Sequence, residues 1–193
     1  MVELLVVLAI SSILLSLMYQ VYLSQLKTHT TQQELVEMQQ NMRAGLYLME
    51  RDIRMAGHAP IGGVADPAIT TSDVDTIQFA MDIRGAGTLD PSDGDTADYG
   101  EQVQYSIDGS GNLVRTINNG AGGWISASLL NSTDIDSLRF SYMDAGGMET
   151  LDPSAIRSVE ITIDASIGTT AMVAPHEMQL RSEVKVRNLG LVP

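Results

Sequence analysis

The first 26 residues form an almost uncharged apolar run, in which the only charged side chain is Glu3. The run is rich in strong helix formers, lacks Gly and Pro, and is long enough to cross the hydrocarbon core of a bilayer as a helix. An unpaired carboxylate in lipid costs roughly 3 kcal/mol on insertion scales. The same helix offers Glu3 no partner, because the next charged residue is Lys27. We therefore expect another copy's amino terminus to supply the partner, so that this end of the chain assembles.

The remainder of the 193-residue chain is polar, glycine-rich and acidic, and its length allows one medium domain beside a long helix. The net charge of −13 argues against nucleic-acid binding, because a surface that reads phosphates needs clustered Lys and Arg. A cationic partner or a divalent metal is compatible with this charge. The chain has no Cys and therefore no disulfide framework. No basic stretch precedes the apolar run and no small-residue cleavage site follows it, so we do not expect an ordinary secretory signal unless a basic leader has been removed upstream.

Beyond Lys27 the apolar residues become periodic and predict an amphipathic continuation of the same helix. They recur at three-and-four spacing: Leu35, Met38, Met42, Leu46, Met49 and Ile53. We predict one helix from about residue 2 to residue 55, ended by Gly57 and Pro60. The apolar stripe should pack against the domain that follows. This divides the chain into an extended helix (1–56), whose residues 1–26 are the membrane or filament-core segment, and a β-rich head domain (57–193).

After residue 57 the periodicity changes to two, which indicates strands. The segment 108–112, Asp-Gly-Ser-Gly-Asn, predicts a hairpin turn. The predicted strands are 77–83, 103–107, 113–117, 124–129, 137–143, 159–163 and 178–186. We expect an α+β fold in which a mostly antiparallel sheet packs one face on the back half of the helix.

The amino-terminal residues 1–10, MVELLVVLAI, resemble the signature of type IV pilins and type II secretion pseudopilins. That signature reads Phe-Thr-(Leu or Met)-(Val or Ile)-Glu-Leu-Leu-Val and follows a short basic leader that ends in Gly. In this alignment Met1 takes the third mature position, so the Phe-Thr pair and the leader would precede it. Weaker matches, in the same order along the chain, resemble the minor pilin W and pseudopilin J group: 47–57, 103–105, 113–115, 138–142, 156–161 and 180–189.

The resemblance implies a pilin fold and a structural role. A prepilin peptidase would cleave the leader and methylate the new terminal amine. The subunit would sit in the inner membrane and then be extracted by the assembly machinery into an extracellular or periplasmic helical filament. Glu3 matches the family glutamate that pairs with a neighbouring subunit's terminal amine. The expected assembly residues are Glu3, Leu4, Leu5, Val7, Leu8, Ile10, Leu14 and Leu15. Many relatives loosen the front half of this helix at a Pro or Gly, and neither occurs in that half here; Ser11, Ser12 and Ser16 could instead bond back to the preceding turn.

The segment 90–101 is dense in carboxylates, and Asp90, Asp93, Asp95 and Asp98 are candidate calcium ligands. The spacing departs from the twelve-residue calcium loop, which needs Gly at position six and Glu at position twelve. An acidic solvated loop is therefore the favoured interpretation and calcium binding the alternative. No other cofactor is expected. Asn131-Ser132-Thr133 is a formal glycosylation sequon, which we expect to be unmodified.

The sequence shows no phosphate-binding Gly loop, nucleophile elbow or His-Glu helix motif, so we do not expect an enzyme. The favoured function is that of a filament-forming subunit of a type IV pilus or related filament. One alternative is a low-copy minor pilin or secretion pseudopilin at the filament tip that primes assembly. A second is a periplasmic domain on a single-pass anchor, to which a carboxylate at the depth of Glu3 would bring no advantage.

Overall fold

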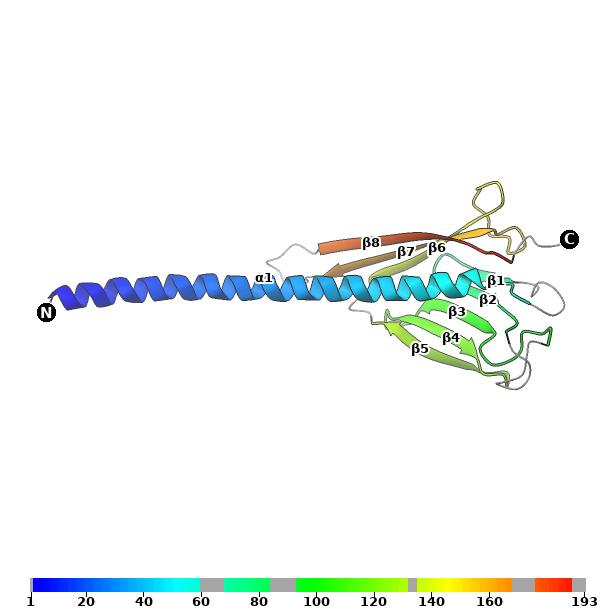
Figure 1. The fold of residues 1–193 in the computed structure, drawn as a ribbon, viewed down its shortest axis with the longest axis horizontal. Helices are drawn as coiled ribbons and strands as arrows, with labels where there is room; N and C mark the ends of the chain where they lie inside the picture. Colours follow the sequence, from blue (N-terminus) through cyan, green and yellow to red (C-terminus); the bar gives the residue numbers. More distant parts are fainter. Residues whose placement is uncertain (1, 60–67, 84–92, 132–134, 168–175, 189–193) are drawn as a thin grey trace. The chain divides into compact units, whose positions relative to one another are not determined.

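A computed structural model describes residues 2–59, 68–83, 93–131, 135–167 and 176–188. The chain forms two compact units, residues 1–39 and 40–193. One continuous helix, α1 (Val2–Arg54), supplies the described part of the first unit and enters the second (Figure 1). The predicted helix is confirmed to within one residue at its carboxyl end.

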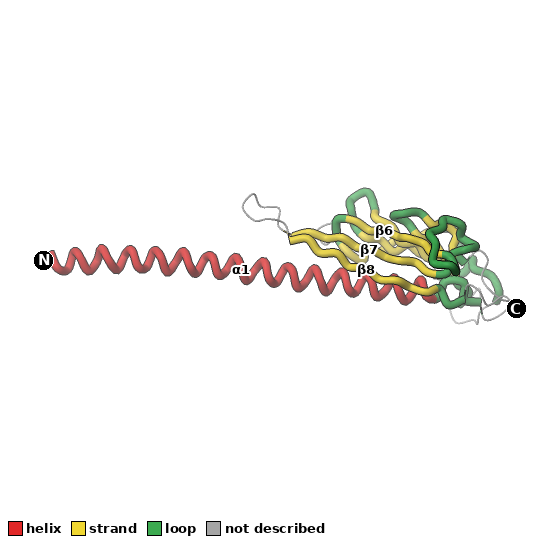
Figure 2. Tube along the Cα trace, turned by 90° about the horizontal axis from the view of Figure 1, so that it is seen from above, coloured by secondary structure: helices red, strands yellow, loops and turns green. Residues whose placement is uncertain are grey.

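The strands form two antiparallel sheets in the second unit (Figures 1 and 2). The five-stranded sheet follows the chain order: β1 (Ile69–Ser72), β2 (Ile77–Ala80), β3 (Gln102–Ile107), β4 (Leu113–Asn118) and β5 (Trp124–Leu130). The three-stranded sheet contains β6 (Ser137–Met143), β7 (Ser158–Ile167) and β8 (His176–Lys185), also in chain order. Within each sheet, every strand therefore pairs with its neighbour in sequence.

All seven predicted strands are present, with four main differences from the prediction. The strands divide between two sheets, β1 was not predicted, β2 ends at Ala80 rather than at residue 83, and β7 extends to Ile167 rather than to residue 163. The early end of β2 has a local cause. The amide of Met81 still bonds in register to the Glu101 carbonyl (2.8 Å), but that of Asp82 donates to the His58 carbonyl instead (2.7 Å). The backbone therefore leaves the strand ladder after Met81 and meets the segment that follows the helix.

The back half of α1 carries much of the core of the second unit. Met42, Met49 and Ile53 are fully buried, which confirms that the apolar stripe is packing surface. Gly45 allows a close approach to the five-stranded sheet: a Cβ there would lie 3.0 Å from Cδ1 of Leu130. On the other sheet, Ser182 Oγ of β8 donates a hydrogen bond to Glu50 Oε1. Residues 40–54 therefore contact both sheets.

The two sheets also bond directly to each other. The Phe140 amide of β6 donates to the Val74 carbonyl in the β1–β2 turn (2.6 Å). The Tyr142 hydroxyl donates to the Asp73 carbonyl (2.8 Å) in the same turn. Phe140 and Tyr142 are each only 2% exposed, whereas the turn that accepts their bonds is exposed, so these bonds lie at the edge of the core. They fix the second sheet against the first.

Gly57 ends the helix in the predicted way. Its φ of 73° lies in the left-handed region, which glycine adopts without steric cost. Its amide donates to the Ala80 carbonyl at the end of β2 (2.8 Å). The helix terminus is thus tied to the five-stranded sheet as well as being stopped. Pro60 lies outside the described residues.

Candidate assembly surface

Every described residue from 2 to 26 is exposed, although most of the side chains are apolar. The seven apolar residues of the predicted assembly set, from Leu4 to Leu15, are 54–67% exposed. Among the described residues, α1 is the one helix long and apolar enough to cross a membrane. Water disfavours an apolar surface of this extent, which on soluble proteins marks a site covered by protein or lipid. This part of α1 is therefore the candidate surface for coverage by lipid or by other chains.

Glu3 lies in the first turn of α1 and is exposed. A carboxylate there interacts favourably with the helix dipole, a contribution of about 0.3–1 kcal/mol. The next charge on the helix, Lys27, is 24 residues away, or about 36 Å along the axis. The helix itself therefore cannot neutralise Glu3, as the sequence predicted.

Hydroxyl groups on the exposed part of α1 bond back to the helix. Of the three serines predicted to do so, Ser12 makes this bond: its Oγ donates to the Ala9 carbonyl (2.8 Å). Thr28 and Thr30 donate to carbonyls four residues earlier, at 3.1 and 3.0 Å. A hydroxyl bonded in this way costs less to bury in an apolar environment. The exposed surface can thus be covered without leaving these donors unpaired.

A buried polar cluster around Asp52 joins the helix to the five-stranded sheet. Asp52 is 5% exposed, and its Oδ2 accepts hydrogen bonds from the Tyr105 hydroxyl (2.8 Å) and from Arg115 Nε (2.9 Å). Its Oδ1 pairs with the largely exposed Arg51 (3.0 Å). Sequence reasoning missed this cluster. The available signal was that Asp52, three residues after Met49, places a charge on the apolar stripe.

Two buried tyrosines should make the head domain sensitive to alkali. Burial, together with the Asp52 charge, raises the pKa of Tyr105 far above its ordinary value near 10. Burial, together with Asp73 and Asp75, does the same for the pKa of Tyr142. In the folded chain both stay protonated while the unfolded chain ionises, so the free energy of unfolding should fall as pH rises above about 10. Chemical denaturation at about pH 9 and pH 11 measures this, and equal stability at both would contradict it.

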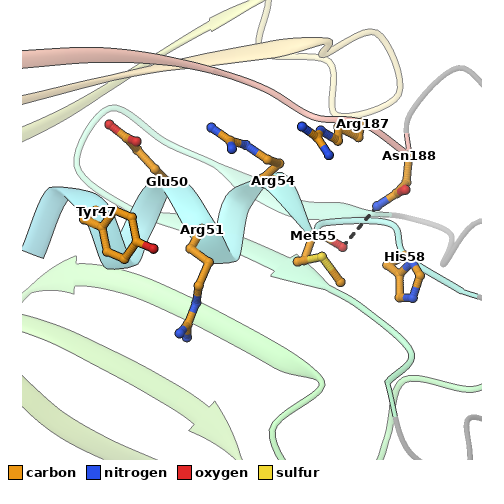
Figure 3. A pocket seen from close by; sticks show the side chains of 8 residues that line it. All are labelled: Tyr47, Glu50, Arg51, Arg54, Met55, His58, Arg187 and Asn188. Carbon is orange, nitrogen blue, oxygen red and sulfur yellow. Dashed lines mark hydrogen bonds between the residues drawn. The ribbon is translucent and has the colours of Figure 1, made fainter.

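A basic pocket of about 330 Å³ lies at the carboxyl end of α1 (Figure 3). Arg54 of the helix and Arg187, which follows β8, lie near each other at its rim, and His58 stands beyond Met55 (Figure 3). Asn188 Nδ2 donates to the carbonyls of Met55 (3.4 Å) and Ala56 (3.2 Å). The remaining lining residues are Tyr47, Glu50 and Arg51. The structure thus gathers cations that are far apart in the sequence.

An acidic pocket of about 390 Å³ lies where β7 ends and β8 begins. Its charged lining residues are Asp136, Asp164 and Glu177. Hydrogen bonds from Gln179 (2.7 Å) and Ser137 (2.7 Å) lower the pKa of Asp164 below its usual range. Asp164 is therefore ionised at neutral pH, and the pocket carries negative charge.

The structure brings together three of the four candidate calcium ligands. Carboxylate oxygens of Asp93, Asp95 and Asp98 all lie within 4.8 Å of one another, whereas Asp90 lies outside the described residues. Asp93 Oδ1 accepts from the Asp95 amide (3.2 Å) and Asp95 Oδ1 from the Ala97 amide (2.9 Å). Carboxylates that cap their own turn in this way are common in solvated loops. The solvated acidic loop thus stays the favoured prediction and calcium binding its alternative, and the state of Asn131 stays a prediction as well.

We expect millimolar calcium to leave the thermal unfolding midpoint of the chain unchanged, because the loop carboxylates already accept hydrogen bonds within the turn. The measurement is thermal unfolding with calcium, with magnesium and with chelator at equal ionic strength. A midpoint that rises with calcium alone, and no longer does so in an Asp93→Asn/Asp95→Asn variant, would establish the metal site instead.

The family of the chain follows from comparison with known proteins. The family model described as prepilin peptidase-dependent protein B matches residues 31–186, which is most of the chain. The chain belongs to this family. It is therefore a type IV pilin-related protein, as the sequence resemblance predicted at this level. The comparisons with curated proteins and with solved structures gave no match. The matched range begins after the apolar run, so the amino-terminal signature is a separate observation.

Proposed function

We propose that this chain is a structural subunit of a type IV pilus or related filament and assembles through the apolar front half of α1. One observation carries the proposal: residues 2–26 are exposed and apolar, and they are joined to a head domain of a prepilin peptidase-dependent family. Helices of this kind can bury one another as fully as lipid buries them. The role is structural, and no catalytic activity is part of the proposal.

The proposed life cycle has two stages. The chain first resides in the inner membrane through α1 and is processed by a prepilin peptidase, which accords with the name of its family. The assembly machinery then moves it into a filament, where Glu3 pairs with the terminal amine of a neighbouring subunit. The apolar surface leaves lipid only when other helices can cover it, so extraction and assembly are coupled.

Among pilin roles, we favour a filament-forming subunit. The alternative is a low-copy subunit at the tip, as the resemblance to the minor pilin W and pseudopilin J group implies. Both roles use the same helix and the same carboxylate. They differ in copy number and in position along the filament.

Electron microscopy of filaments sheared from cells tests the proposal. An epitope inserted between Gly109 and Ser110, in the exposed β3–β4 turn, would leave the strands of the head domain intact. Label along the whole filament indicates the filament-forming role, and label at ends alone indicates the tip role. Membrane-bound chain with no labelled filament, in cells that have a complete assembly machinery, would favour the single-pass anchor.

A further inference from the structure

The head domain has an electrostatic polarity along β8. The acidic pocket includes Glu177, near the start of this strand, and the basic pocket includes Arg187, just after its end. Ten residues of extended chain separate the two, which is roughly 33 Å. Both pockets belong to the compact unit of residues 40–193, which contains the end of α1 together with the head domain and is called the head below. One unit therefore presents opposite charges at two ends of the same strand.

The basic pocket is exceptional in so acidic a chain. The chain has 24 acidic residues and 11 Lys and Arg, so copies of it repel one another unless opposite charges meet locally. Arg54 and Arg187 are both exposed, and among the described residues neither forms an ion pair or a side-chain hydrogen bond. Of the other charges there, Arg51 is paired with Asp52, and Glu50 accepts from Ser182.

Stabilisation of the helix end does not account for both arginines. Cations in the last turn of a helix interact favourably with its dipole, which explains Arg54 in part. Arg187, however, belongs to the segment after β8. The terminal carbonyls of Met55 and Ala56 already accept hydrogen bonds from Asn188. Two guanidinium groups thus remain available to an anionic partner.

We propose that the two pockets are the halves of a head-to-tail contact, in which the basic pocket of one copy binds the acidic pocket of the next. Arg54 and Arg187 of one head would meet Asp136, Asp164 and Glu177 of its neighbour. A contact between two different patches leaves a free patch at each end, so it repeats without closing unless the copies form a ring. This inference rests on the proposed filament role and assigns the charged contact between successive heads.

Disulfide crosslinking of the full chain in cells tests the contact. The chain has no Cys, so Met55→Cys and Ser166→Cys introduce a single pair, one in each pocket, without removing a charge. Ser166 is paired with Glu177 on β8, and the Met55 carbonyl bonds to Asn188. The two sites in one chain are therefore tens of ångströms apart, whereas a disulfide needs Cα atoms within about 7 Å. Mild oxidation should give a ladder of multimers from the double variant, and dimers at most from either single variant.

Charge reversal identifies what holds the contact. Adding Arg54→Glu and Arg187→Glu to the double-Cys chain should remove all bands above the dimer. Further addition of Asp136→Lys and Glu177→Lys should restore them. An unchanged ladder after the first reversal would overturn the electrostatic contact. If cells display filaments but the double-Cys chain gives no ladder, the head contact is overturned and the proposed function is not. If neither the double-Cys chain nor the unaltered chain forms filaments, and no ladder appears, the proposed function is overturned as well.

Discussion

Replacement of Glu3 by Ala should reduce filament yield at least about tenfold while leaving the chain in the membrane. The alanine side chain is apolar, so the front half of α1 remains long and apolar enough to insert. What is lost is the one charged side chain of residues 1–26, and with it the proposed pairing to a neighbour's terminal amine. A charge pair in an apolar environment that is worth even about 1.4 kcal/mol changes an equilibrium tenfold. Membrane fractionation and microscopy of sheared filaments measure the two effects separately.

Glu34→Ala is the matched control for this variant. Glu34 is also an exposed carboxylate of α1, but it lies beyond the apolar run, so its loss should leave both insertion and filament yield unchanged. Glu3→Gln keeps the size of the side chain and removes its charge, so it should behave like Glu3→Ala. A wild-type yield from either Glu3 variant would show that this carboxylate has no pairing role in assembly.

The elements of the fold were predictable because their signals are local. The three-and-four spacing from Leu35 to Ile53 and the alternation of 137–143 each lie within a few consecutive turns or residues. Division into two sheets depends instead on distant contacts, such as the bond between Phe140 and Val74. Strand β1 has only four residues and a register shift against β2, so it lacks a full period-two pattern. Local periodicity contains no information on such pairings.

The candidate sites divide in the same way. Glu3 stands out as one charge in an apolar run, and the acidic loop stands out by composition. The basic pocket could not be predicted, because Arg54 and Arg187 are 133 residues apart and only the fold brings them together. The partners of Asp52 could not be predicted either, although the sequence shows that Asp52 lies on the apolar stripe. Such a position predicts that a charge needs a buried partner but does not name the partner.

Asp52→Asn should lower the free energy of unfolding of the head domain by about 3 kcal/mol, or roughly 10 °C in the unfolding midpoint. The amide keeps the shape of the side chain but removes the charge that accepts from Arg115 and Tyr105. Arg115, whose side chain is 24% exposed, is then left partly buried without a counter-ion. Thermal and denaturant unfolding of the full chain in detergent measures the loss. Glu183→Gln makes the same chemical change at an exposed site and should shift the midpoint little.

The double variant Asp52→Asn/Arg115→Met distinguishes two contributions to the free energy of unfolding. One is the stabilisation by the ion pair, and the other is the destabilisation that follows when one buried charge loses its partner. Removal of one member of a buried pair is expensive because the other stays charged, whereas removal of both is often nearly neutral. The double variant should therefore be more stable than Asp52→Asn alone, although it carries one more substitution. The Tyr105 hydroxyl can then donate only to the oxygen of an uncharged amide, so a residual loss of about 1 kcal/mol is expected. If the losses in free energy of unfolding caused by Asp52→Asn and by Arg115→Met simply add in the double variant, the two groups do not interact. The cluster would then not be what holds α1 to the five-stranded sheet.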